Sequence, residues 1–167
     1  DPGEKTFFDV GADDIQKEFD LNMRGTWLPS KVMTPLLIGQ QGACVLNVSS
    51  MSAFTPLTRI PGYSGAKAGV SSFTQWLATY LARSGIRVNA IAPGFFMTEQ
   101  NHALQFNPDG TPTPRCAHIV DGTPMRRYGE LKELIGAMLF LVDERAASFV
   151  TGIVLPVDGG YSAFSGV

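Results

Sequence analysis

Residues 43–50 read ACVLNVSS, and residues 61–94 read PGYSGAKAGVSSFTQWLATYLARSGIRVNAIAPG. Residues 43–48 and 87–92 are short, nearly continuous apolar runs, a pattern typical of strands that are covered on both faces. Residues 61–84 predict a long helix between them, and Gly85 ends it. A strand, a helix and a second strand in this order predict an α/β fold with a parallel sheet and helical crossovers.

The flanking segments continue this alternation. Residues 13–38 predict a long helix, and Pro29 within it predicts a kink or a break at that point. Residues 131–142 predict a third helix, and residues 153–157 predict a last strand. The whole chain therefore fits one α/β unit without internal repeats.

Residues 95–128 do not follow the alternation. They contain both histidines of the chain and several prolines. A long irregular connection inside a compact domain is usually functional or disordered. We expect this segment to be a lid that covers a substrate site.

Composition excludes several classes of protein. The chain has 167 residues, of which 44% are hydrophobic and 17% charged, and its formal net charge is −2. This balance gives no electrostatic reason to expect a nucleic acid or an anionic membrane as partner. No apolar run is long enough to span a bilayer. Cys44 and Cys116 lack the spacing of a metal site, so we expect free thiols, no metal and a cytoplasmic location.

Tyr63 and Lys67 are the first residues that suggest chemistry. They are four residues apart at the start of a predicted helix and therefore share one face. A lysine ammonium beside a phenol favours the phenolate and lowers the tyrosine pKa. A tyrosine of this kind can act as a general acid or base toward an alcohol or a carbonyl.

Other polar residues fall at the ends of the predicted strands, where open α/β sheets bind their ligands. Ser50 follows the strand at 43–48, and its hydroxyl can hold a carbonyl oxygen that gains negative charge. Pro93 and Gly94 end the next strand, and Thr98 follows them. Asn22 lies inside a predicted helix, where asparagine is a poor helix former.

With these motifs in order, the chain resembles the short-chain dehydrogenase/reductase family. The matching segments are DLNMRGT around Asn22, LNVSS ending at Ser50, YSGAK at 63–67, RVNAIAPG at 87–94, PGFFMT at 93–98 and TGIVLPVDGG at 151–160. The resemblance implies the C-terminal part of a Rossmann-like, doubly wound parallel sheet.

The resemblance also implies roles for individual residues. Tyr63 would exchange a proton with the substrate oxygen, and Lys67 would hold the ribose hydroxyls of NAD or NADP. Ser50 would bind the reacting carbonyl, and Asn22 would order a water molecule in a proton relay. The expected cofactor-binding residues are Tyr63, Lys67, Pro93, Gly94, Phe96 and Thr98.

Structural explanations are also open for three of these residues. Asn22 could be a packing amide, the Phe96 side chain could be simple packing, and Thr98 could cap the helix that follows it.

The family's glycine-rich cofactor turn, TGxxxGxG, has no counterpart in the sequence. We therefore expect residues 1–167 to be the catalytic part of one short-chain dehydrogenase domain, with residues 95–128 as its lid and with the N-terminal dinucleotide-binding part absent. The charged residue that distinguishes NAD from NADP is absent with it.

The segment after PGFFMT suggests the substrate. The run Thr98-Glu99-Gln100-Asn101, the insertion FNPDGTPTPR and the ending SAFSGV resemble the D-mannonate oxidoreductase (fructuronate reductase) branch of the family. The resemblance implies that the keto group of a sugar acid such as D-fructuronate is reduced to give D-mannonate. The candidate substrate residues are Ser50, Gln100, Asn101 and Arg115, while Arg59, His102 and His118 are further candidates near the predicted mouth.

Two alternatives stay open. A 3-oxoacyl thioester or another carbonyl compound could be the substrate of the same chemistry. The chain could also be a truncated, non-catalytic fragment that keeps its active-site residues. The family resemblance further implies a homo-oligomer, either a tetramer or a dimer.

Overall fold

A three-stranded parallel sheet forms the centre of the molecule. The computed structural model describes residues 6–166, except for the side chain of Gln100. The strands are β1 (Cys44–Val48), β2 (Arg87–Pro93) and β3 (Val154–Val157), in the order β1-β2-β3. Val45 pairs with Val88, and Ala92 pairs with Pro156. The predicted α/β fold class and its parallel sheet are confirmed.

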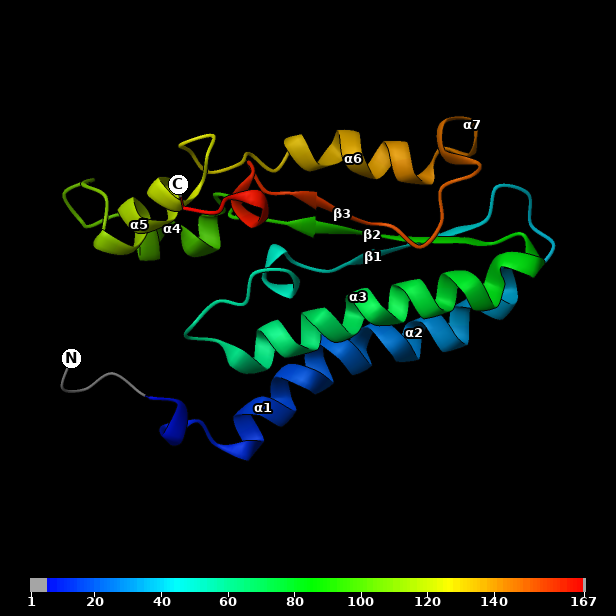
Figure 1. The fold of residues 1–167 in the computed structure, drawn as a ribbon, viewed down its shortest axis with the longest axis horizontal. Helices are drawn as coiled ribbons and strands as arrows, with labels where there is room; N and C mark the ends of the chain where they lie inside the picture. The colour runs from blue at the N-terminus through cyan, green and yellow to red at the C-terminus, as the bar shows by residue number, and fades with distance from the viewer. Residues whose placement is uncertain (1–5, 167) are drawn as a thin grey trace.

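Helices cover both faces of the sheet (Figure 1). On one side lie α1 (Ala12–Glu18), α2 (Gly25–Met33) and α3 (Pro61–Leu81), and on the other lies α6 (Glu133–Val142). The remaining helical segments are η1 (Phe7–Asp9), η2 (Phe19–Arg24), η3 (Thr34–Leu37), η4 (Met51–Ala53), η5 (Ala82–Ser84), α4 (Glu99–Gln105), α5 (Pro114–Gly122), α7 (Glu144–Ala147) and η6 (Tyr161–Ala163). None of the helices in the described part of the chain has the length and hydropathy needed to cross a membrane.

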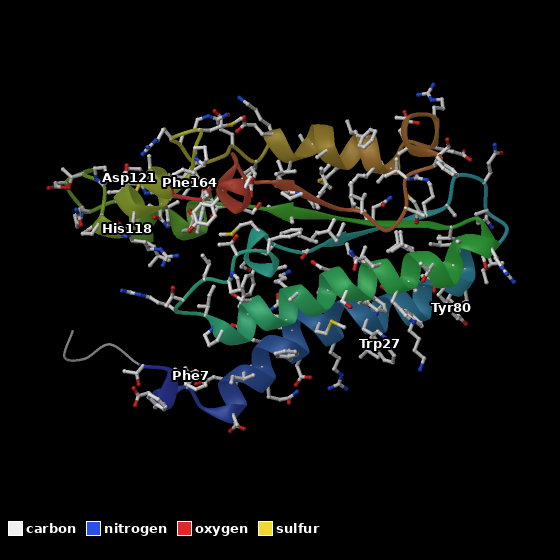
Figure 2. All side chains as sticks on the ribbon, in the orientation of Figure 1. Phe7, Trp27, Tyr80, His118, Asp121 and Phe164 are labelled. Carbon is white, nitrogen blue, oxygen red and sulfur yellow. The ribbon has the colours of Figure 1, made fainter. Side chains whose placement is uncertain are left out.

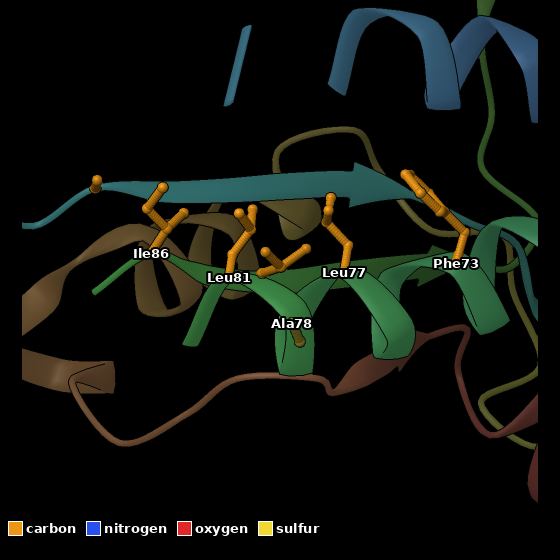
Figure 3. Close-up of a cluster of buried hydrophobic side chains, with 7 residues drawn as sticks. Phe73, Leu77, Ala78, Leu81 and Ile86 are labelled. Carbon is orange, nitrogen blue, oxygen red and sulfur yellow. The ribbon is translucent and has the colours of Figure 1, made fainter. Parts of the chain in front are cut away.

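Residues 61–94 include α3 and β2, and the apolar face of α3 packs against the sheet to form the core. Phe73, Leu77 and Leu81 recur at helical spacing on the buried face of α3. Figure 3 shows them in one cluster with Ala78 and Ile86. The predicted helix also ends as expected, because Gly85 has φ of 73° and can adopt the left-handed conformation without strain.

Burial differs between β1 and β2, although both were predicted from similar apolar runs. Residues 87–92 of β2 are all buried, as predicted for a strand covered on both faces. In β1, by contrast, Val45 and Leu46 are half-buried, and Val48 is 51% exposed. Helices α3 and α6 both contact β1, so its two faces are covered as predicted, but less completely than those of β2, because β1 is an edge strand that pairs with β2 alone.

The region predicted as one helix over residues 13–38 consists of four consecutive helical segments, α1, η2, α2 and η3. Its main departure from α-helical geometry is not at Pro29. Residues Phe19–Arg24 form a π-helical segment, in which the Gly25 amide donates to the Asp20 carbonyl. Pro29 lies inside α2 without ending it. Pro29 has no amide hydrogen, so one backbone hydrogen bond of the helix is lost. The Ser30 hydroxyl donates to the Thr26 carbonyl and supports the same turn.

Residues 95–128 are more regular than expected, since they contain α4 and α5. The Thr98 hydroxyl accepts from the Asn101 amide at the start of α4, and the Thr113 hydroxyl accepts from the Cys116 amide at the start of α5. Pro114 occupies the first turn of α5, where its lack of an amide hydrogen costs nothing. Both helices lie at the end of the sheet toward which the strands point (Figure 1).

Candidate active site

Two serines follow the end of β1, and the first of them connects the strand to α3. The Ser49 hydroxyl lies 3.1 Å from the Lys67 carbonyl, to which it donates, and 2.6 Å from the Ser71 hydroxyl. Ser50 is buried, and its oxygen accepts hydrogen bonds from the Ser52 amide at 3.2 Å and the Ser52 hydroxyl at 3.0 Å. Because both bonds are accepted by Ser50, its own hydroxyl hydrogen can be donated to a bound molecule.

Tyr63 and Lys67 share one face of α3, as their spacing predicts. The Lys67 ammonium lies 5.7 Å from the centroid of the Tyr63 ring, and both side chains are half-buried. Lys67 also donates to the Val48 carbonyl at 2.9 Å, which anchors it to the end of β1. Burial lowers the pKa of Lys67, and the negative charge of Glu18 acts in the opposite direction.

Asn22 faces the same region from the π-helical segment. Its amide nitrogen donates to the Glu18 carbonyl at 3.0 Å and to the Glu18 carboxylate at 2.9 Å. Asn22, Lys67 and Val48 line one open cavity of about 420 Å³. The structure therefore brings three of the four candidate catalytic residues, Asn22, Tyr63 and Lys67, into one neighbourhood, and Ser50 adjoins it through η4, which packs on α3.

Three glycines on α3 allow this close approach, and the sequence analysis missed them. A Cβ at Gly62 would lie 3.4 Å from Glu18 Cβ, one at Gly65 would lie 3.4 Å from the Phe19 ring, and one at Gly69 would lie 3.0 Å from the Met23 sulfur. Their spacing of three and four residues places them on one face of α3, and this spacing was the available signal.

The turn after β2 is held by its own packing. The Gly94 amide donates to the Val157 carbonyl at 2.9 Å, and a Cβ at Gly94 would lie 2.6 Å from Asp158 Cα. Phe96 forms a bridge with Gly129, and its ring fills the space beside that residue. The structural reading of Thr98 is confirmed, since it caps α4, and Pro93 and Gly94 lie at the strand end where ligands bind.

A second cavity, of about 480 Å³, lies between α5, the loop before α3 and the C-terminal segment. Arg115 and His118 line it from α5, Arg59 lines it from the loop, and Phe95 and Tyr161 form part of its apolar wall. Figure 2 shows His118 at the same end of the molecule as Phe164. Arg115, Arg59 and His118, predicted from sequence to lie near one mouth, are therefore brought together.

The other substrate candidates are placed differently. The Asn101 side chain accepts from the Thr98 amide at 3.0 Å and donates to the Phe96 carbonyl at 2.8 Å, so it holds the turn before α4. His102 packs against the Phe106 ring, with 4.8 Å between the ring centroids. The side chain of Gln100 lies outside the described part of the structure.

Tyr128 is a second tyrosine near this end of the sheet, but its environment differs from that of Tyr63. Its hydroxyl donates to the Gln105 side chain at 2.6 Å. Burial and the neighbouring Cys116 raise the pKa of Tyr128 far above the ordinary value of a tyrosine, while Arg115 acts in the opposite direction. A phenol held in this way is a poor general acid or base near neutral pH.

The residues around the 420 Å³ cavity fit the ribose of a nicotinamide cofactor. The hydroxyl groups of the ribose both donate and accept hydrogen bonds, and the Lys67 ammonium and the Asn22 amide offer matching partners. The glycine-rich turn that would bind the pyrophosphate is not part of this sequence. The residues present therefore fit the nicotinamide half of the cofactor.

Comparisons with known proteins agree with this geometry. A family model described as "Enoyl-(Acyl carrier protein) reductase" matches residues 1–162. The chain belongs to this family of short-chain dehydrogenases and reductases, a class of oxidoreductases.

Individual relatives are similar over almost the whole chain. An "Uncharacterized oxidoreductase" of Haemophilus influenzae is 56% identical over 98% of this chain and 57% of its own length. The "Uncharacterized oxidoreductase UxuB" of Bacillus subtilis is 48% identical over 98% of this chain and 59% of its own length.

A solved structure from Haemophilus influenzae, described as a "putative D-Mannonate oxidoreductase" with bound NAD, superposes with a TM-score of 0.95 at 55% identity. It is matched over 100% of this chain and 60% of its own length. The chain thus spans about three fifths of the length of these relatives.

Proposed function

We propose that the chain is the catalytic part of an NAD- or NADP-dependent oxidoreductase that interconverts a ketone and a secondary alcohol. The observation that carries this proposal is the Lys67 ammonium, which lies over the Tyr63 ring and is held by the carbonyl at the end of β1. When bound, the cofactor supplies the hydride. The described residues bind and orient the substrate oxygen and move its proton.

In this proposal, Tyr63 donates a proton to the oxygen of the ketone in the direction of reduction. The positive charge of Lys67 stabilises the phenolate that is left behind. Ser50 donates a hydrogen bond to the same oxygen, since its own oxygen is already engaged by Ser52. Asn22, which shares a cavity with Lys67, belongs to the path that returns the proton to Tyr63.

We propose a sugar acid of the D-fructuronate and D-mannonate type as the substrate. The cavity lined by Arg115, Arg59 and His118 supports the proposal that the substrate carries a carboxylate, because guanidinium groups bind carboxylates through two parallel hydrogen bonds. The same cavity includes Ile60, three residues before Tyr63, so a molecule bound there can reach the start of α3. The name of the 55% identical solved structure points to the same class of substrate.

An assay on the full-length protein tests the substrate. Purified enzyme should oxidise NADH or NADPH in the presence of D-fructuronate, and it should do so faster than with a neutral ketose of similar size. The competing substrate class is a 3-oxoacyl thioester, which the name of a 35% identical relative, a "3-oxoacyl-[acyl-carrier-protein] reductase" of Synechocystis, supports. Higher kcat/KM with the thioester than with D-fructuronate would overturn the sugar-acid proposal and keep the oxidoreductase proposal.

We also propose that the enzyme works as a homo-oligomer in the cytoplasm. Large apolar side chains are exposed on α3 and α6, among them Trp76, Tyr80 and Leu139. Burying such side chains against another copy is favourable. Light scattering of the full-length protein distinguishes a monomer from a dimer or a tetramer.

A further inference from the structure

Glu18, the last residue of α1, binds one of the candidate catalytic residues, Asn22, and acts electrostatically on another, Lys67. Its carboxylate accepts from the Asn22 amide nitrogen at 2.9 Å, and its backbone carbonyl accepts from the same nitrogen at 3.0 Å. Its negative charge also acts on Lys67. Neither the motif spacing nor the roles described above assign any task to Glu18.

The two bonds determine which way the Asn22 amide points. Both acceptors belong to Glu18, so the nitrogen of the amide must face it and the oxygen Oδ1 must face elsewhere. Asn22 and Lys67 line the same cavity, and Oδ1 is the Asn22 atom left to accept a hydrogen bond there. The orientation of the amide decides whether Asn22 accepts or donates a hydrogen bond toward the cavity.

Packing fixes Glu18 in this position. A Cβ at Gly62 would lie 3.4 Å from Glu18 Cβ and 3.5 Å from its Cγ, so the stem of Glu18 lies directly against the turn of α3 that precedes Tyr63. A larger residue at position 62 would push Glu18 away from this turn. The contact links Glu18 to the helix that carries Tyr63 and Lys67.

We propose that Glu18 is a positioning residue of the active site, which orients the Asn22 amide and supplies the negative charge next to Lys67. Among the described residues, the charged and titratable groups that act on Lys67 or lie against it come from two elements. Glu18 is at the end of α1, and Tyr63 is on α3 itself. Burial works against the ammonium form of Lys67, and Glu18 works in its favour. Glu18 thus favours the charged form of Lys67 beside Tyr63.

The titration of Lys67 in the full-length protein, without substrate, tests this proposal. Competitive labelling of lysines with acetic anhydride over a pH series, read by mass spectrometry, gives the pKa of Lys67 in each variant. Glu18→Gln keeps the size of the side chain and an oxygen that accepts from Asn22, and it removes the charge. Asp20→Asn is the matched control, because Asp20 is an exposed carboxylate two residues away that pairs with Arg24.

The expected result is a lower Lys67 pKa in Glu18→Gln and an unchanged pKa in Asp20→Asn. The proposal is overturned if Glu18→Gln leaves the Lys67 pKa unchanged, or if Asp20→Asn lowers it equally. This titration needs no turnover, so it stands apart from the substrate proposed above.

A kinetic comparison tests the orientation of Asn22 and rests on the proposed function. Glu18→Ala, which removes both charge and acceptor, should lower kcat about tenfold, whereas Glu18→Gln should lower it less. Equal kcat values in Glu18→Ala and the wild type would show that Glu18 does not position Asn22 for proton transfer. Absence of turnover in the wild type with every substrate tried would count against the proposed function and leave the titration result standing.

Discussion

The Lys67 ammonium lies 5.7 Å from the centroid of the Tyr63 ring, one helical turn away on the same face of α3. The 2.9 Å bond from Lys67 to the Val48 carbonyl adds a second point of attachment at the end of β1. The helix thus supplies the pair and the strand fixes its position, so the geometry needed for proton transfer depends on the packing of α3 against the sheet.

Replacement of Lys67 should impair both cofactor binding and turnover. Lys67→Ala removes the donor to the ribose and the positive charge next to Tyr63, so we expect a higher Kd for NADH and a kcat lower by about 10²-fold or more. Because burial lowers the pKa of Lys67, the wild-type rate should fall as pH rises through a value below 10.5. Kd from fluorescence titration and a pH profile of kcat measure these effects. An unchanged Kd would separate Lys67 from the cofactor.

Replacement of Arg115 should affect acidic substrates selectively. Arg115→Ala removes one cation from the 480 Å³ cavity, and we expect KM for D-fructuronate to rise about tenfold or more. KM for a neutral analogue should change much less. Arg83→Ala, an exposed arginine near the end of α3, is the matched control. Equal changes for the acidic and the neutral compound would exclude Arg115 from the carboxylate site.

The turn after β2 should not tolerate a methyl group at Gly94. In Gly94→Ala the new Cβ would lie 2.6 Å from Asp158 Cα, which is backbone, so we expect a loss of about 1–3 kcal/mol in the free energy of unfolding. Gly136→Ala in α6 is the control, since nothing lies within 4 Å of its Cβ. This change should stabilise the protein by about 0.5–1 kcal/mol. Urea unfolding of both variants measures the difference.

The pair Arg127–Glu133 should make stability depend on pH in the acid range. The Arg127 guanidinium holds Glu133 through two bonds of 2.7 Å and lowers the pKa of Glu133 to about 2. Since the folded-state pKa lies below the unfolded one, the contribution is present above about pH 4.5 and is lost as pH falls toward 2. Glu133→Gln should therefore lower Tm at pH 7 and change it little near pH 2. An equal change at both pH values would contradict this linkage.

The sequence predicted the parts of the structure that local patterns control. The parallel order of the strands, the long helix α3 and its end at Gly85 follow from apolar periodicity and glycine chemistry, and each is confirmed. The cap at Thr98 was one of the two readings offered for that residue, whereas helices α4 and α5 and the Thr113 cap were not predicted, because proline-rich spacing obscured two short helices.

Features that the sequence did not predict depend mainly on contacts between distant segments. The exposure of Val48 goes with the position of β1 at the edge of the sheet, which the apolar run at 43–48 does not by itself encode. The packing of the segment around Asn22 against α3 depends on the close approach allowed by the glycines of α3. Asn101 stays a predicted substrate residue, and the structure adds that its amide is bound to the backbone of its own turn.

The most direct test of the account is the turnover of Tyr63→Phe in the full-length protein. This change keeps the ring beside Lys67 and removes only the hydroxyl. We expect the rate of NAD(P)H oxidation with D-fructuronate to fall by about 10²- to 10⁴-fold, with the Kd of the cofactor nearly unchanged. Near wild-type turnover in Tyr63→Phe would contradict the claim that Tyr63 is the proton donor.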